Sequence, residues 1–194
     1  WVLEGLFGPS YKIISTKKLQ DAGYLAKLNI KVLLMKHEPQ KFDTYEEEVQ
    51  YIINNEKRNK FIKNLAHDLK GNTLILYSRV ATHGQVLFDL INIGNRKVFF
   101  VHGGVDAQER EEVRRITETE KDAIIVASFG TFSTGINIKN LHNIIFASPS
   151  KSRIRTLQSI GRVLRKGNNK ISATLFDIAD DTKKGSRNNY TLNH

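Results

Sequence analysis

From residue 72 onward, short apolar runs rich in β-branched residues alternate with segments of helical periodicity. The runs cover residues 73–78, 97–101, 123–128, 143–148 and 171–178. An amphipathic segment over 81–91 follows the first run. A charged segment over 106–120 follows the second, and Asp106, with Glu109 three residues on, predicts the start of a helix there. Strands that are apolar almost throughout, separated by helices, favour a parallel sheet buried on both faces. The predicted fold class is therefore α/β.

The first third of the chain has weaker patterns. A strand is predicted over residues 30–35. Thr44 and Glu47 have the spacing of a capping box and predict the start of a helix. A second helix is predicted to end at Gly71.

These patterns divide the chain into three segments. Residues 1–28 are interpreted as a connector and short helix from a preceding domain, 29–180 as one α/β domain, and 181–194 as a polar tail, truncated or disordered. The chain starts at Trp1 and its only methionine is Met35, so we expect it to be a piece of a longer protein.

The positive charge of the chain is unevenly distributed. The net charge is +10, and no Asp or Glu occurs from Ala123 to Phe176, although many Lys and Arg residues do. Phosphates attract Lys and Arg and repel carboxylates, so this stretch predicts a polyanionic partner. The alternative is a basic surface that only keeps the chain soluble.

Several classes of protein are excluded or disfavoured by composition. The chain has no cysteine, which excludes disulfides, cysteine–zinc sites and thiol catalysis. No apolar run reaches the roughly 18 residues that a membrane span needs, and no signal-like segment is present. No metal-ligand motif is found. We therefore expect a monomer in the cytoplasm, that of a host cell if the source is viral, with no membrane partner.

The ends of the predicted strands carry small, polar or glycine residues. They read Ser78-Arg79, His102-Gly103-Gly104, Ser128-Phe129-Gly130-Thr131 and Ser148-Pro149-Ser150. In open α/β sheets ligands gather at the carboxyl ends of the strands. Hydroxyls and backbone amides exposed there suit contact with phosphate.

A helix predicted over 152–166 carries two stripes on different faces. The apolar stripe is Leu157, Ile160 and Leu164, and the polar stripe is Gln158, Arg162 and Arg165. No local carboxylate can pair with these arginines, so they suit bidentate contact with phosphate. Gly161 inside the helix costs about 1 kcal/mol relative to Ala, which suggests close approach of another backbone.

Four segments together resemble the conserved motifs of superfamily two helicases and translocases. QSIGRVLR resembles motif VI, and LILYSRVATHGQVLFDLI resembles motif IV. VFFVHGGVDAQERE is similar to motif IVa, and IIVASFGTFSTGINIKNLHNIIFASPS to motif V. Over residues 72–178 their order and spacing match the second RecA-like domain of these motors. The front segment is more loosely similar to the UvsW-type helicases of tailed bacteriophages.

The resemblance implies roles for individual residues. Arg165 would reach the γ-phosphate of ATP, with Arg162 beside it and Gln158 positioning the pair. Gly135 and Asn137 would lie near the nucleotide, although many relatives have Asp where Asn137 stands. A further set would face the nucleic-acid backbone: Ser78, Arg79, His102, Gly103, Ser128, Phe129 and Thr131.

Two parts of an ATP-driven motor are not found in the sequence. It contains no phosphate-binding G-x-x-x-x-G-K-[ST] loop. Its acidic pairs fall in predicted helices or in the segment DIADD, interpreted as a loop. ATP with Mg²⁺ would then be bound mainly by a first RecA-like domain of the same polypeptide, and this chain alone would hydrolyse ATP negligibly.

The resemblance therefore implies the C-terminal motor domain of an ATP-dependent DNA helicase or translocase, acting on branched DNA in recombination or repair. Whether the substrate is DNA or RNA stays open at this point. Two alternatives remain: a non-catalytic nucleic-acid-binding module with a Rossmann-like core, and a small-molecule α/β enzyme. The latter lacks any nucleophile–base pattern. Arg79 and His102 also remain interpretable as ordinary surface groups.

Overall fold

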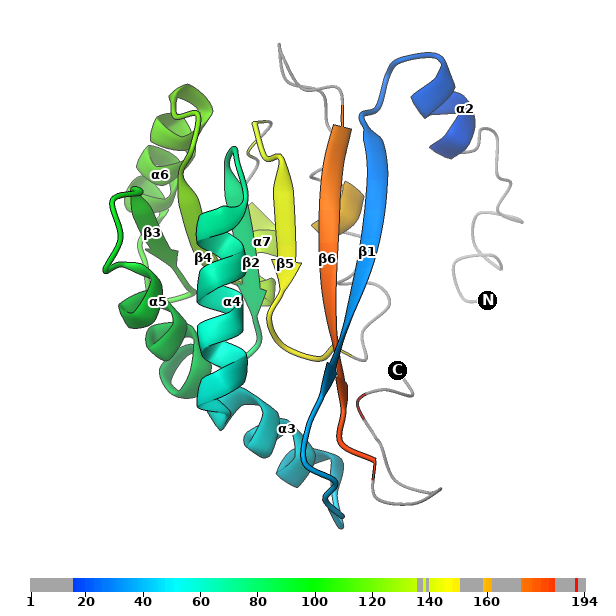
Figure 1. Ribbon diagram of the computed structural model, residues 1–194. Coiled ribbons are helices and arrows are strands. Elements are labelled where there is room, and N and C mark those ends of the chain that lie inside the picture. Colours follow the sequence, from blue (N-terminus) through cyan, green and yellow to red (C-terminus); the bar gives the residue numbers. More distant parts are fainter. Residues whose placement is uncertain are drawn as a thin grey trace, which may run out of the picture.

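The computed structural model describes residues 16–135, 138, 140–150, 159–161, 172–183 and 191. Its six strands form one sheet in the order β1-β6-β5-β2-β4-β3, and every neighbouring pair is parallel (Figure 1). The strands are β1 (Lys27–Lys36), β2 (Thr73–Tyr77), β3 (Val98–Val101), β4 (Ile124–Ser128), β5 (Asn143–Phe146) and β6 (Ser172–Asp181). The predicted parallel α/β sheet is confirmed.

Helices pack on both faces of this sheet. In chain order they are α2 (Thr16–Asp21), α3 (Tyr45–Asn54), α4 (Glu56–Asp68), the π-helical turn η1 (Val80–Gly84), α5 (Gln85–Ile91), α6 (Ala107–Thr119), α7 (Phe129–Gly135) and a helical turn at 159–161. One core cluster joins α4 and α5 to the sheet, and the other joins α6, α7 and Ile160 to its opposite face. The sheet is thus sandwiched, as its apolar strands require.

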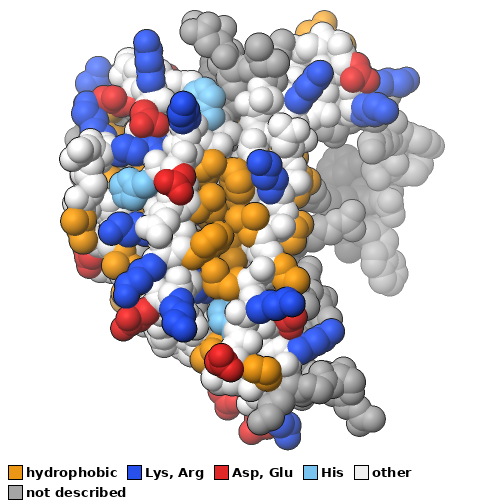
Figure 2. Space-filling view, in the orientation of Figure 1, with side chains coloured by type: hydrophobic (Ala, Val, Ile, Leu, Met, Phe, Trp, Pro, Cys, Tyr) orange, Lys and Arg blue, Asp and Glu red, His pale blue; other side chains and the backbone are white. Residues whose placement is uncertain are grey.

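Beyond α4, the sheet face that α4 and α5 pack against is less covered. Hydrophobic side chains gather between α4 and β1, bordered by Lys and Arg (Figure 2). Leu33 and Met35 on β1 are only partly buried there, against Phe176 and Ile178 of β6. On the opposite face of β1, Val32 is 63% exposed.

Local sequence signals explain where the helices begin. The Thr44 side chain accepts a hydrogen bond from the Glu47 amide at 3.2 Å, and the Asp106 side chain accepts one from the Glu109 amide at 2.8 Å. Gly71 follows α4 with a φ of 86°, the left-handed region that favours glycine. These predicted caps are confirmed.

Two predicted boundaries differ from the structure. The segment predicted as one helix from 81 begins with the π-helical turn η1. At the end of this turn, Gly84 packs so closely on Tyr77 that a Cβ would lie 2.4 Å from the ring. The segment DIADD is not a loop: β6 continues to Asp181. Its ten-residue register with β1 and the burial of Asp180 against Arg58 extend the strand.

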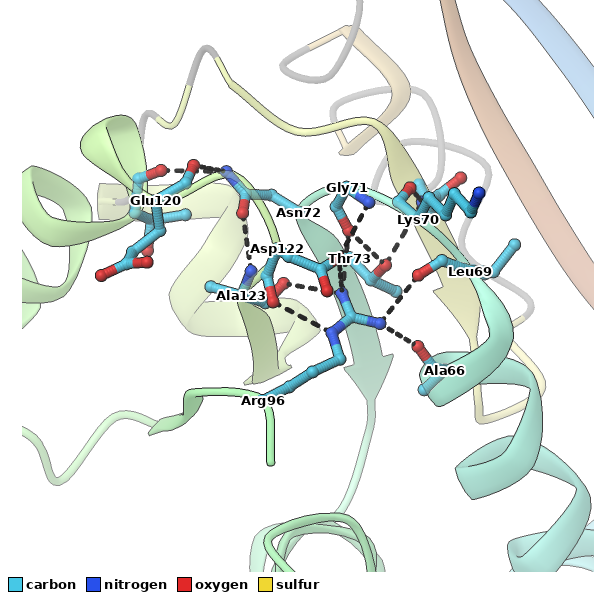
Figure 3. A network of polar contacts seen from close by, with 12 residues as sticks. Ala66, Leu69, Lys70, Gly71, Asn72, Thr73, Arg96, Glu120, Asp122 and Ala123 are labelled. Carbon is cyan, nitrogen blue, oxygen red and sulfur yellow. Dashed lines mark hydrogen bonds and ion pairs between the residues drawn. The ribbon is translucent and has the colours of Figure 1, made fainter. Parts of the chain in front are cut away.

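At the amino end of the sheet, a polar network joins the segments that lead into the strands (Figure 3). The Asn72 amide group donates to the carbonyls of Thr117, Glu120 and Asn140 at 2.8–2.9 Å and accepts from the Ala123 amide at 2.8 Å. Arg96 donates to the carbonyl oxygens of Ala66, Leu69, Gly71 and Asp122 at 2.6–2.9 Å. Side chains therefore satisfy backbone groups that the sheet leaves unpaired.

Part of the polar C-terminal segment contacts α3. The Glu48 side chain is fully buried, and its Oε1 accepts a hydrogen bond from the Thr182 hydroxyl at 2.8 Å. Its Oε2 accepts from the Thr191 amide at 3.0 Å. The three-segment division at 28 and 180 stays a prediction. In the described ranges, no helix is both long and apolar enough to span a membrane.

Candidate nucleic-acid and nucleotide interface

The loop after β2 is held by a buried hydrogen-bond network. The Ser148 hydroxyl accepts from the Ser78 amide at 3.1 Å and lies 2.9 Å from His83 Nδ1. His83 Nε2 lies 3.3 Å from Asn59 Oδ1, which can only accept, so Nε2 carries the proton. Nδ1 then accepts from the Ser148 hydroxyl. This network joins the ends of β2 and β5 to α4.

His83 is neutral in this network. Its side chain is fully buried, and burial, together with the positive charge of Arg58, lowers its pKa to about 3. A neutral ring is what the donor–acceptor chain from Asn59 to Ser148 needs.

A buried ion-pair cluster lies beside this network. Arg58 Nε donates to Asp180 Oδ1 at 2.8 Å, and His37 Nε2 contacts the same oxygen at 2.8 Å. Arg58 Nη1 donates to the carbonyl oxygen of Ala147 at 2.6 Å. Burial alone would raise the pKa of Asp180, but hydrogen bonds from His37 and Arg58 lower it overall. The cluster thus fixes the residue that precedes Ser148.

Arg79 does not extend freely from the end of β2. Its Nη2 atom donates to both carboxylate oxygens of Glu46 on α3. The Arg79 side chain is 30% exposed and that of Glu46 is 60% exposed. This ion pair lowers the pKa of Glu46. The expected contact of Arg79 with nucleic acid stays a prediction, and Ser78 beside it is exposed.

The loops after β3 and β4 meet at the same edge of the sheet. His102 is half-buried, its ring centroid lies 5.0 Å from that of Phe100, and its Nδ1 accepts from the Gly104 amide at 3.1 Å. Gly103 is exposed, and a Cβ built on it would lie 4.0 Å from the Thr131 hydroxyl oxygen. The structure therefore brings these predicted residues together.

The start of α7 is more buried than predicted for a ligand-facing segment. Ser128 Oγ accepts from the Thr131 amide at 3.2 Å and lies 2.8 Å from the Thr131 hydroxyl. The Phe129 side chain is 2% exposed and packs with its ring centroid 5.4 Å from that of Phe146. A role of Phe129 towards nucleic acid is therefore limited to its backbone.

The predicted nucleotide-binding residues fall mostly outside the described residues. Gln158, Arg162, Arg165 and Asn137 lie outside the described residues. Gly135 is described and is the last residue of α7. Between them, Ile160 packs against the core on the α6 and α7 face. Gly161 is exposed, and a Cβ on it would meet nothing within 4 Å. Within the part of the chain that the structure describes, no residue makes the close approach expected at Gly161.

The described residues offer no evident site for a divalent cation. Within those residues, no group of three or more His, Asp or Glu side chains is arranged to hold a metal ion. Asp177 on β6 is half-buried, and burial, then the nearby Asp180, raise its pKa. The described His, Asp and Glu side chains therefore do not form a Mg²⁺ ligand set by themselves.

Comparison with known proteins identifies the family. Residues 56–167 match the family described as helicase conserved C-terminal domain. The chain belongs to this family. The helicase domain is 39% identical over 209 residues to the ATP-dependent DNA helicase uvsW of Enterobacteria phage T4, covering 98% of this chain and 41% of that protein. The crystal structure of T4 UvsW matches with a TM-score of 0.72 and 39% identity over 87% of this chain and 38% of that one.

More distant relatives share parts of the helicase domain. The ATP-dependent RNA helicase SUB2 of Kluyveromyces lactis is 27% identical over 135 residues, which cover 68% of this chain and 30% of that protein. The C-terminal part of the Fun30 ATPase domain shares the fold, with a TM-score of 0.53 and 20% identity over 62% of this chain and 39% of that one. The alignments with this chain span 41% of the length of the phage T4 helicase and 30% of the length of the Kluyveromyces lactis helicase.

These comparisons confirm the predicted RecA-like α/β fold and the resemblance to UvsW-type helicases. Sequence patterns did not indicate Arg58 or Glu46 as parts of the site. One signal was available for Arg58: it precedes Ile62 and Ala66 at intervals of four, so it lies on the apolar stripe of α4. An arginine on such a stripe needs a buried partner.

Proposed function

We propose that the helicase domain is the second motor domain of an ATP-dependent DNA helicase or translocase that remodels branched DNA in recombination or repair. The observation that carries this proposal is the 39% identity to the T4 DNA helicase over 98% of the chain. The acid-free basic stretch from Ala123 to Phe176 supports a polyanionic substrate.

In this proposal, ATP is held between two RecA-like domains of one polypeptide. Arg165 and Arg162 stabilise the charge that develops on the transferred phosphate, and Gln158 positions them. Gly135 and Asn137 lie near the nucleotide. Mg²⁺ and most ATP contacts belong to the other domain. Among the described residues nothing lies within 4 Å of a Cβ built on Gly161, and this supports a close approach there by atoms from outside the chain.

The nucleic-acid backbone is proposed to lie along the carboxyl edge of the sheet. Ser78, Arg79, His102 and Gly103 lie at this edge on the loops that follow β2 and β3. Ser128, Phe129 and Thr131 contribute through the loop after β4, Phe129 by its backbone. Contacts of this kind fix the backbone without reading sequence, so affinity is expected to fall with salt.

The test is Arg165→Ala in a polypeptide that carries both RecA-like domains. ATP turnover is expected to fall by at least about 10³-fold with DNA affinity unchanged, because the arginine acts on the transition state. Lys170→Ala is the matched control, since Lys170 lies in the same acid-free stretch but outside Q-x-x-G-R-x-x-R. Turnover that survives Arg165→Ala, or substantial turnover by the 194-residue chain alone, contradicts the proposal.

A further inference from the structure

The ion pair between Arg79 and Glu46 blocks the two edges by which an arginine binds phosphate. A guanidinium binds an oxyanion in bidentate fashion through Nε and Nη2 or through Nη1 and Nη2. Both edges include Nη2, and Nη2 is the atom that donates to both oxygens of Glu46. A phosphate can therefore take either edge of Arg79 only if the carboxylate leaves.

The two partners of this pair differ in how firmly they are held. Arg79 follows Ser78, whose amide is bound by the buried Ser148 hydroxyl, and its own carbonyl oxygen accepts from the Gly84 amide at 2.8 Å. Glu46 lies in the first turn of α3 and is 60% exposed. Gln50 donates to its Oε1 at 3.3 Å. The carboxylate is thus the partner that can move away into solvent.

Charge gives a second reason to regard Glu46 as a competitor. Glu46, Glu47 and Glu48 occupy the first turn of α3, where the helix dipole favours carboxylates. The Glu48 carboxylate is buried and accepts a hydrogen bond from the Thr182 hydroxyl, and the Glu47 carboxylate accepts one from the Asp43 amide. Glu46 alone of the three bonds an arginine at the proposed phosphate edge. A carboxylate there repels a nucleic-acid backbone and lowers its affinity.

We infer that Glu46 stands in for a backbone phosphate on Arg79 and competes with nucleic acid for it, so that binding exchanges the carboxylate for a phosphate. This inference rests on the proposed function, because it requires that Arg79 contacts the backbone. Glu46 lies outside the matched segment 56–167, so the competitor belongs to a flanking helix of this chain. Glu46 thereby lowers the affinity of the domain for nucleic acid.

The test measures binding of the 194-residue chain to a fluorescein-labelled oligothymidylate by anisotropy over a salt series. Glu46→Gln is expected to raise affinity about two- to fivefold, the range of an exposed ion pair. The dependence of log affinity on log salt should steepen by up to about one contact, because Arg79 is released for phosphate. In an Arg79→Ala background, Glu46→Gln should keep only the smaller gain that follows from the loss of one negative charge.

Glu56→Gln is the matched control, because it removes one acid from the neighbouring helix, where Glu56 pairs with Lys60. An equal gain from Glu56→Gln and Glu46→Gln would mean that net charge alone acts, and would overturn the inference. A loss or no change on Glu46→Gln would also overturn it, a loss showing that Glu46 orients Arg79 for binding. Arg79→Ala separates the two ideas: if it leaves affinity unchanged, the proposed backbone contact of Arg79 fails as well.

Discussion

The two ends of the sheet each contain an arginine network, half-buried at the amino end and fully buried at the carboxyl end, and the networks differ in how completely they are satisfied. At the amino end, each guanidinium nitrogen of Arg96 reaches a backbone carbonyl, and Nη2 also contacts Asp122 at 3.0 Å. At the carboxyl end, Arg58 is fully buried, yet its Nη2 has no hydrogen-bond partner among the described residues. The same side chain thus serves two different environments.

The difference follows from what each network holds in place. Arg96 and Asn72 form hydrogen bonds with backbone groups where the strands begin, so their contribution is structural. Arg58 instead carries an ion pair, whose burial costs solvation, to the edge where the loops present Ser78 and Arg79. In return, Arg58 fixes the position of Ala147 and, through the next residue Ser148, that of the loop after β2.

The largest expected effect is that of Arg58→Met. Removing the arginine leaves the buried Asp180 carboxylate without its guanidinium partner, so the free energy of unfolding should fall by about 3–5 kcal/mol. Urea denaturation followed by circular dichroism measures this loss. Lys57→Met, at an exposed position of the same helix, should cost no more than about 0.5 kcal/mol. Equal costs for the two variants would show that the ion pair contributes little.

The architecture of both ends was predictable from sequence because its signals are local. Apolar runs and their spacing predicted the strands, and Thr44 and Asp106 predicted two helix starts through hydrogen bonds to residues three positions away. The polar residues at the strand ends followed from the same patterns, since parallel strands place their carboxyl ends together. The resemblance to helicase motifs then supplied the residues proposed to contact nucleotide and nucleic acid.

The partners of these residues were not predictable in the same way. Arg58 and Asp180 are 122 positions apart, and Arg79 and Glu46 are 33 apart. Such pairs depend on which strands become neighbours: β6 lies between β1 and β5, although it comes last in the chain. The extension of β6 through DIADD was not predictable for the same reason, because Asp180 finds its partner Arg58 on α4, 122 positions away.

At the amino end, Asn72→Ala should reduce stability without affecting binding. The substitution removes the bonds to Thr117, Glu120 and Asn140 and leaves the buried Ala123 amide without its acceptor. A loss of roughly 2–3 kcal/mol in the free energy of unfolding is expected.

Oligothymidylate affinity, measured well below the melting temperature, should match that of the unsubstituted chain. The exposed Asn95→Ala variant serves as the control for an amide lost without buried bonds. A weaker affinity of Asn72→Ala would contradict the separation of the two ends, because it would couple the amino end to the binding edge.

The smallest expected effect is a pH dependence that belongs to the carboxyl end alone. His83 has a pKa of about 3 in the fold and an ordinary value of 6.5, so it stays neutral when folded but gains a proton when unfolded. The contribution of the neutral His83 ring to the free energy of unfolding is therefore complete above pH 6.5 and is lost as the pH falls toward 3. Between pH 6.5 and 5.5 this should remove about 1 kcal/mol, measured by urea denaturation at each pH. His83→Gln should lose that part of the dependence of the free energy of unfolding on pH. Asn72→Ala should retain it, because Asn72 does not titrate. An unchanged pH dependence in His83→Gln would mean that the buried ring is not kept neutral by the network around Ser148.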